Sequence, residues 1–417
     1  MTVRTSSLRR VVAARFISRA GSEAAFFVGL WGKAAFVMGA TAYQLAALMF
    51  VVSAATIVGS IAGGALVDRM GPKRVLALAE VAFVPAALAM AFAQQLWLLI
   101  ALAGLWALVG APVQTAAASF APYLTDEEDE LARVNSRIEG ASALAFAAGP
   151  AVGALLVRFA HVDWVFALDA VTSAIAAALV WRVETAAPVR AEDGRGALAQ
   201  SLEGMRVALR LRPLRYYMLL GTVVWLAFGS FGALEPLFFR DVVGTSIEAM
   251  SWMNSFFGAG FLIGAALLPR LPKRLISARG LALFVALTGL GTSLYVGTSD
   301  LRVIAAGALL WSVVIGTMEP LLRTLLHRDS PRGAVGRIMG ATETLHRAGE
   351  VVPLAFAPRL AALFGVQATL IAGGLLATAA AALSVGEAAA IDRARRPEEL
   401  PVEPAAVSAQ DPFPPHP

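Results

Sequence analysis

Long apolar runs constrain this chain more than any other feature of its sequence. Twelve runs of about 20 residues, the length a helix needs to cross a bilayer, are separated by short charged or Pro/Gly-rich breaks. Apolar residues make up 58% of the chain and charged residues 15%, which excludes a water-soluble globular protein and a disordered one. We therefore expect an all-α membrane protein with twelve transmembrane helices, at 11–38, 41–67, 75–92, 96–120, 135–157, 163–181, 214–239, 247–268, 278–298, 301–322, 338–364 and 367–390.

The distribution of basic residues predicts the orientation of the chain. The net charge is only +5. Of the 34 Lys and Arg residues, 26 belong to the two ends of the chain and the even-numbered connections, whereas five belong to the odd-numbered connections. Basic residues gather on the cytoplasmic side of membrane proteins. We therefore expect an integral protein of the plasma (inner) membrane with both termini cytoplasmic. The small net charge gives no reason to expect a nucleic-acid partner.

The chain also matches itself at an offset of 200 residues. Pro-Lys-Arg occurs at 72–74 and again at 272–274, and Arg-Ile-x-Gly-Ala at 137–141 and again at 337–341. One register across separate segments indicates duplicated halves of the same orientation, related by an axis along the membrane normal. We expect two parallel-repeat six-helix bundles at 1–181 and 214–390, a cytoplasmic linker at 182–213 with an amphipathic helix at 198–211, and a disordered cytoplasmic tail at 391–417.

The connection after the second span carries the most specific motif. Its run Gly64-Ala-Leu-Val-Asp68-Arg69-Met-Gly71-Pro72-Lys73-Arg74 closely resembles the loop signature of the major facilitator superfamily, with Pro72 where the family usually has a basic residue. The resemblance implies that this loop latches the inner ends of the two halves. A carboxylate next to basic groups at a helix boundary can bind helix ends and opposite charges. The latch residues are then Gly64, Asp68, Arg69, Gly71, Lys73 and Arg74.

A second motif lies in the fifth span. The run Gly149-Pro150-Ala-Val-Gly153 resembles the antiporter signature of drug exporters in the superfamily. The acidic loop and the Arg133-Val-Asn135 entry before it are similar to those of the drug:proton antiporter branch that includes macrolide efflux proteins and the enterobactin exporter. The spacing of Gly149 and Gly153 also fits close helix packing, and the two interpretations are compatible.

Two spans keep several ionisable residues, which are costly in hydrocarbon. Arg15, Arg19 and Glu23 lie at i, i+4 and i+8 in the first span, and Glu343, Arg347 and Glu350 at i, i+4 and i+7 in the eleventh. One interpretation is that intrahelical ion pairs only make insertion tolerable. The other is proton coupling by Glu23 with Arg19, or by Glu350 with Arg347, since desolvation favours a protonated carboxyl. An acid in the first span also resembles several drug/proton antiporters of the superfamily.

Three tryptophans, Trp106, Trp225 and Trp311, fall well inside the fourth, seventh and tenth spans, the helices that line the substrate cavity in the family the chain resembles. Tryptophan favours the membrane interface. At mid-depth it therefore either packs in the core or forms an aromatic wall for a bulky apolar or cationic ligand. Glu235 and Glu319 are each followed by proline near the end of a span, and we expect both to be exposed to the lipid headgroups.

Signatures of enzymes and of nucleotide-driven pumps are absent. The chain has no Walker loop, HExxH pair or Gly-x-Ser-x-Gly elbow, so we expect no enzyme, cofactor or metal site. The resemblance implies a secondary active exporter of amphipathic drugs or secondary metabolites, working as a monomer by proton antiport with alternating access. Its partners would be the lipid bilayer, a small-molecule substrate and protons. A proton-coupled importer of a small metabolite and a non-transporting membrane sensor or scaffold with the same fold stay open.

Overall fold

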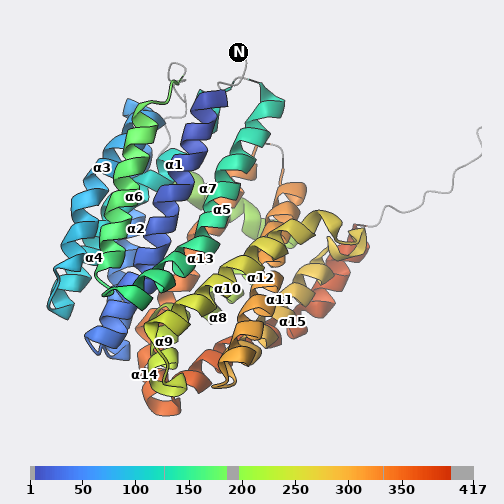
Figure 1. The fold of residues 1–417 in the computed structure, drawn as a ribbon. Helices are drawn as coiled ribbons and strands as arrows, with labels where there is room; N and C mark the ends of the chain where they lie inside the picture. Colours follow the sequence, from blue (N-terminus) through green and yellow to red (C-terminus); the bar gives the residue numbers. More distant parts are fainter. Residues whose placement is uncertain (1–4, 126, 186–196, 332, 396–417) are drawn as a thin grey trace, which may run out of the picture.

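A computed structural model describes residues 5–125, 127–185, 197–331 and 333–395, which fold as helices and short connections (Figure 1). Ten helical segments are long and apolar enough to cross a membrane, which confirms the predicted all-α membrane protein. They are α2 (Ala42–Met70), α3 (Pro72–Ala91), α4 (Leu96–Ala118), α5 (Glu128–Phe159), α6 (Trp164–Trp181), the segment Arg212–Val243, α10 (Ile247–Leu267), α11 (Ala278–Val296), α12 (Leu301–Asp329) and α15 (Val366–Ala394).

The first and eleventh predicted spans are the two outside that set. The first is α1 (Thr5–Ala24) followed by the π-helical segments η1 (Ala25–Leu30) and η2 (Gly32–Val37). The eleventh is α13 (Val335–Val351), a 3₁₀ turn η7 (Val352–Ala355) and α14 (Ala357–Phe364), and it changes form where Pro353 supplies no backbone N–H. Both are helical, but they carry the charges of the predicted ion pairs, which lower their hydropathy.

The segment Arg212–Val243 has a break like that of the first span. It consists of α8 (Arg212–Phe228), α9 (Phe231–Leu237) and a π-helical segment η4 (Phe238–Val243). The repeat pairs this segment with the first span, and both end in π-helix. Such segments are rare and often accompany functional sites.

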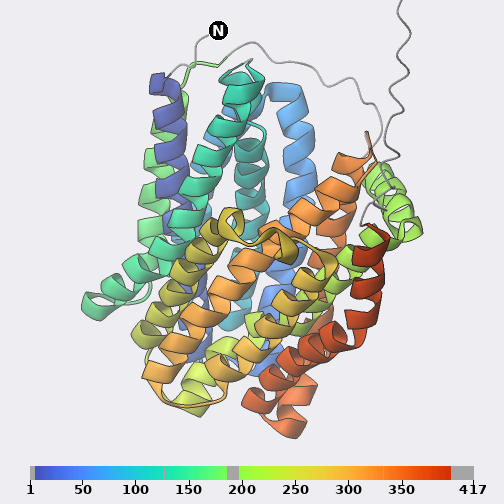
Figure 2. The same cartoon turned by 90° about the vertical axis from the view of Figure 1, so that its right-hand side faces the viewer.

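The predicted amphipathic linker helix is confirmed as α7 (Ala197–Arg210), which lies beside the C-terminal helices (Figure 2). Glu203 of α7 forms an ion pair with Arg337 of α13. A side chain at Gly204 would collide with the Arg337 carbonyl, so glycine allows this close approach. Residues 186–196 of the predicted linker and 396–417 of the predicted tail lie outside the described residues.

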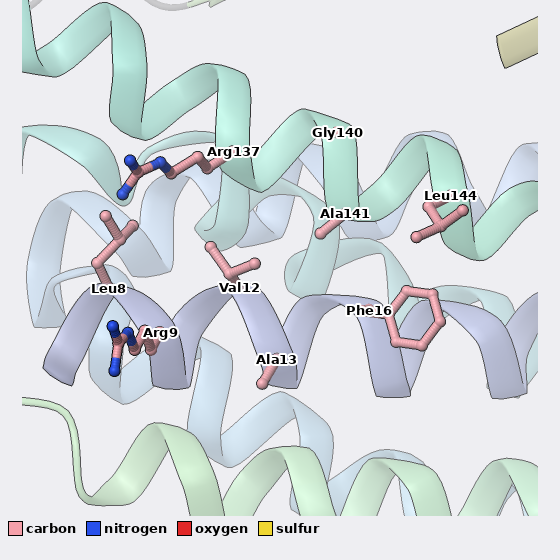
Figure 3. A pocket seen from close by; sticks show the side chains of 9 residues that line it. All are labelled: Leu8, Arg9, Val12, Ala13, Phe16, Arg137, Gly140, Ala141 and Leu144. Atoms are coloured by element: carbon pink, nitrogen blue, oxygen red, sulfur yellow. The ribbon is translucent and has the colours of Figure 1, made fainter. Parts of the chain in front are cut away.

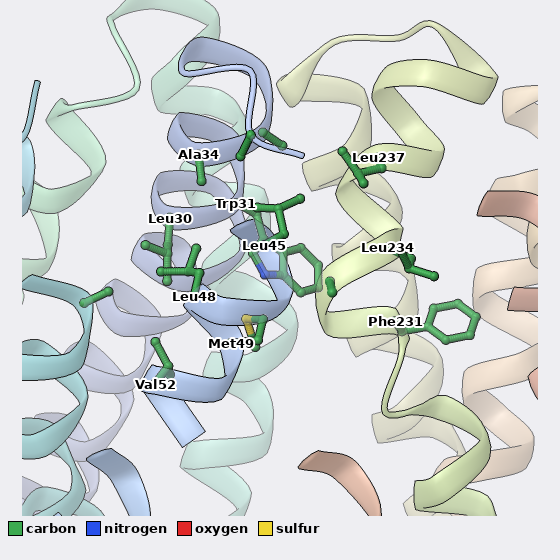
Figure 4. Packing of buried hydrophobic residues seen from close by; sticks show 14 of the residues in the cluster. Leu30, Trp31, Ala34, Leu45, Leu48, Met49, Val52, Phe231, Leu234 and Leu237 are labelled. Carbon is green, nitrogen blue, oxygen red and sulfur yellow. The ribbon is translucent and has the colours of Figure 1, made fainter. Parts of the chain in front are cut away.

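The two ends of the bundle differ in how tightly the spans meet. We call the end that holds the start of α1 and the 64–74 motif the basic end, and the end that holds the connections at 38–41 and 244–246 the far end. At the far end, side chains of the first two spans, among them Trp31 and Met49, face Phe231 and Leu234 of α9 in one apolar cluster (Figure 4). The spans of the two halves therefore meet in a packed core at the far end.

A hydrogen-bonded contact reinforces this closure. Arg240 Nη1 donates to the carbonyls of Ala35 at 2.6 Å and Ala40 at 3.0 Å. At the basic end, by contrast, Asp68 is exposed and a Cβ added at Gly64 would meet no atom within 4 Å. The molecule is thus closed at the far end, while its motif loop is uncovered at the basic end.

Candidate functional site

Glu23 lies where α1 and α5 approach most closely. Its side chain forms the predicted ion pair with Arg19, one turn earlier on α1, and the residue is only 5% exposed. A Cβ on Gly149 of α5 would collide with the Glu23 Cβ and with the backbone of Ala20 and Ala24. Gly149 of the antiporter-like motif therefore lets α5 approach the backbone of α1 closely beside Glu23.

A second carboxyl, Asp169 of α6, lies beside the same part of α1, against Gly21 and Ser22. It is fully buried, at 0% exposure. Its Oδ2 accepts a hydrogen bond from the indole Nε1 of Trp106 on α4 at 2.9 Å, and its Oδ1 accepts one from the Ser22 hydroxyl at 3.0 Å. Trp106, predicted to pack or to line a cavity, is buried against Phe83 with its only polar atom bonded to this carboxyl.

Glu80 of α3 is the third buried carboxyl, at 2% exposure. It lies beside Ser18 of α1 and Ser173 of α6. Its Oε2 atom and the Ser173 hydroxyl make no hydrogen bond within the described part of the chain. We call Glu23, Glu80 and Asp169 the buried carboxyl cluster; only Glu23 has a basic side chain within ion-pair distance among the described residues.

Arg15 is the other charge near this cluster. Its Nε donates to the Ser142 hydroxyl on α5 at 2.7 Å, and its Nη2 donates to Gln114 Oε1 on α4. Both acceptors are neutral, so Arg15 joins three helices, and it forms no ion pair with a carboxylate of the described residues. Burying a carboxylate without a neighbouring cation is costly. Because the cluster has three carboxyls and only two arginines lie near it, at least one carboxyl can be neutral by binding a proton.

The charges of the eleventh span are arranged differently. Arg347 pairs with Glu343 at 3.1 Å and with Glu350 at 3.3 Å, as predicted, but the three side chains are exposed or half-buried. His346, on the same helix, is buried with its ring 6.0 Å from that of Trp225. The polar atoms Trp225 Nε1, Glu319 Oε1 and His346 Nε2 are buried without a hydrogen bond to any described residue.

Trp311 of α12 is the centre of an aromatic group. Its ring lies between 5.0 and 5.3 Å from the rings of Phe228, Phe231, Phe257 and Tyr295. The Trp311 Nε1 atom finds no acceptor in the described residues. This arrangement can pack a core or accept a flat apolar group.

The expectation that Glu235 and Glu319 face the headgroups is wrong. Glu235 is only 7% exposed and accepts a hydrogen bond from the Tyr295 hydroxyl at 2.5 Å. The reason is that its span runs on through η4 to Val243, which places Glu235 inside the bundle. The Glu319 side chain is 14% exposed and lies 3.9 Å from Arg323.

The motif loop at the basic end has a defined backbone. Gly71 ends α2 with a positive φ of 78°, a conformation that favours glycine, and its N–H donates to the Val67 carbonyl at 2.8 Å. Pro72 then occupies the first position of α3, where a missing N–H costs nothing. The departure at Pro72 is thus compatible with the loop. Asp68 makes no ion pair with any residue that the structure describes.

Sequence reasoning passed over three residues that the structure makes prominent. Glu80 and Asp169 were missed because each stands apart from other charges in an apolar span, whereas the predicted sites lie in spans with several ionisable residues. Lys33 is buried, with Nζ 2.6 Å from Asp163, and donates hydrogen bonds to the carbonyls of Met90 and Ala91. An isolated charged residue within an apolar run was the one sequence signal that could have identified these three residues. The described residues contain no group of three His, Cys, Asp or Glu placed to hold a metal ion.

Comparison with known proteins now identifies the class. The model of the Major Facilitator Superfamily matches residues 11–353, so the chain belongs to this superfamily; it is a secondary transporter and not an enzyme. "Multidrug efflux pump Tap" of Mycobacterium tuberculosis is 26% identical over 362 residues, covering 82% of each chain. "Uncharacterized MFS-type transporter YfiS" of Bacillus subtilis is 24% identical over 364 residues, covering 82% of this chain and 84% of that one.

Solved structures show the same fold. A mutant of the nucleoside transporter NupG superposes with a TM-score of 0.76 at 9% identity, covering 91% of this chain and 99% of that one. A POT family transporter in complex with 5-aminolevulinic acid gives a TM-score of 0.76 at 12% identity, covering 92% and 96%. At these identities the likeness concerns the fold alone.

Proposed function

We propose that this protein exports amphipathic small molecules, drugs or secondary metabolites, from the cytoplasm in exchange for protons, and that it acts as a monomer. The buried carboxyl cluster is the observation that carries the proposal. Its three carboxyls are 5%, 2% and 0% exposed, and they form one ion pair among the described residues. Buried carboxyls in transmembrane helices are costly, and binding and releasing a proton is a function that would explain their presence. The similarity to an efflux pump supports the direction.

Glu23 is the proposed site of coupling. Arg19, the more exposed partner at 30%, holds the carboxylate while the proton is absent. A cationic substrate, or a movement of α1 that withdraws Arg19, leaves Glu23 free to take a proton. Exchange then follows because substrate and proton compete for one carboxylate. Gly149 allows α5 to pack closely against α1 beside Glu23, where a larger side chain would collide with the α1 backbone.

Alternating access is the proposed route. The six-helix halves at 1–181 and 214–390, with residue n lying over n + 200, are related by an axis along the membrane normal, and they rock against each other so that one end of the bundle opens while the other closes. In this proposal the basic end and both termini face the cytoplasm, as the positive-inside rule favours, and the closed far end faces outward. In the opposite state the motif residues Gly64, Asp68, Arg69, Gly71, Lys73 and Arg74 latch the basic end.

The aromatic residues supply the proposed recognition surface. Trp311 has a buried indole N–H without an acceptor in the described residues, which a substrate acceptor could satisfy, whereas Trp225 lies beside the Glu319 carboxyl. Trp106 serves differently, because its N–H is bonded to Asp169. Glu350 with Arg347 is the second candidate for coupling, and its greater exposure makes it the weaker one.

Proton movement on adding substrate to inverted membrane vesicles tests the proposal. Candidate substrates come from a susceptibility panel in a pump-deficient bacterial host. Antiport requires proton release from energised vesicles when an exported compound is added, and Glu248→Gln at the far end serves as a control for loss of a carboxyl. Proton movement together with substrate, in the same direction, would indicate a coupled importer. No proton movement with any compound that the panel identifies would favour a sensor or scaffold.

A further inference from the structure

A cavity of about 430 Å³ lies between α1 and α5 at the basic end. Figure 3 shows that the two helices contribute opposite walls. The lining from α1 is Leu8, Arg9, Val12, Ala13 and Phe16, and that from α5 is Arg137, Gly140, Ala141 and Leu144. We call this cavity the α1–α5 groove.

The groove is charged at one end and apolar at the other. Arg9 and Arg137 lie toward one end on opposite walls, with Leu8 between them, and Phe16 and Leu144 lie at the opposite end (Figure 3). Both arginines are exposed, and neither has an ion pair with a described residue. The groove therefore presents two unneutralised cations beside an apolar channel.

The face of α5 beside the groove is apolar and exposed. Leu144, Val152, Leu155 and Phe159 are all exposed, between 42% and 83%. Their spacing of eight, three and four residues places them on one side of the helix. A stripe of exposed apolar residues on a transmembrane helix contacts acyl chains. Arg15 and Ser142, which lead toward the buried carboxyl cluster, do not line this cavity.

We propose that the α1–α5 groove binds an anionic phospholipid, with the lipid phosphate between Arg9 and Arg137 and one acyl chain along Phe16 and Leu144. Arginine suits this role because its guanidinium forms paired, charge-assisted hydrogen bonds to phosphate. Basic pockets between helices at the cytoplasmic side of a membrane recognise anionic headgroups in this way. The bound lipid would rest on the two helices that hold Glu23 and Gly149, but the proposal does not depend on the transported substrate.

Lipid retention measured by native mass spectrometry on the purified full-length protein tests this site. We expect phosphatidylglycerol to be retained at least about tenfold more than phosphatidylcholine of the same acyl length, because charged hydrogen bonds of this kind contribute that much. Arg9→Gln with Arg137→Gln should abolish the preference. The control, Arg270→Gln with Arg274→Gln, removes two exposed basic residues outside the groove and should preserve it.

A second variant keeps the test independent of the charges. Gly140 has open space around its Cβ position, so Gly140→Leu should fold normally and fill the apolar part of the groove. It should weaken retention of phosphatidylglycerol while leaving binding of glycerol phosphate unchanged. Equal retention of the two lipids by the wild-type protein, or an equal loss in the control pair, would overturn the proposal. Full competition by glycerol phosphate would also overturn it, since the site would then bind a free anion and no lipid.

Discussion

Replacing Trp106 by phenylalanine would reveal the charge of the most buried carboxyl. The substitution removes the 2.9 Å hydrogen bond to Asp169 and leaves the 3.0 Å bond from Ser22. A hydrogen bond between neutral groups contributes about 0.5–1.5 kcal/mol, and one to a charged group about 1.5–3 kcal/mol. Asp169 has no basic partner within ion-pair distance in the described residues, so our account makes it a neutral acid and predicts the smaller range for this bond.

The loss of indole volume is separated from the lost bond by repeating the substitution in an Asp169→Asn background. Asparagine is always neutral, its oxygen can accept from Trp106, and its amide can donate to Ser22. Trp106→Phe should therefore destabilise both proteins equally, within about 0.5 kcal/mol. The assay is reversible unfolding in mixed micelles followed by far-ultraviolet circular dichroism. A cost at least about 1 kcal/mol larger in the wild-type background would show a charged Asp169 and refute this reasoning.

Three further predictions concern the helix contacts. Gly149→Leu should lower the melting temperature and stop transport, because backbone atoms of α1 block the new side chain and overpacking costs about 1–3 kcal/mol. Its control is Gly140→Ala, which adds a methyl group in open space on the same helix. Normal transport by Gly149→Leu would contradict the close contact. Asp68→Asn should reduce transport at normal expression, whereas a wild-type rate would end the latch interpretation. Arg240→Gln should increase labelling of a cysteine introduced at Ala35, because the far end loses two hydrogen bonds; unchanged labelling would show that the apolar cluster alone closes it.

The sequence predicted the fold well because the signal for a transmembrane helix is local. About 20 consecutive apolar residues suffice to predict a span, and α2, α4 and α12 follow from that rule alone. The intrahelical ion pairs of Arg19 and Arg347 were also predictable, since a spacing of three or four residues places side chains on one helix face. The break after α1 was not predictable, because π-helical segments depend on packing against neighbouring helices.

The candidate site was predicted only in part, because it joins residues distant in the chain. Glu23 stood out through its charged neighbours on α1. Asp169 and Glu80 acquire their importance only when α6 and α3 bring them to the same side of α1, which no local pattern reveals. Glu235 was misjudged for the same reason: proline signals the end of a regular helix, but the chain continues inside the bundle as η4.

Proton-driven export by the Glu23→Gln variant tests the central claim most directly. Glutamine mimics the protonated acid and cannot exchange a proton. The measurement is substrate export in vesicles under an imposed pH gradient, beside substrate binding and melting temperature in the same preparation. We predict that gradient-driven export is lost while binding and folding survive. Export at the wild-type rate would reject Glu23 as the coupling residue and point to Glu350.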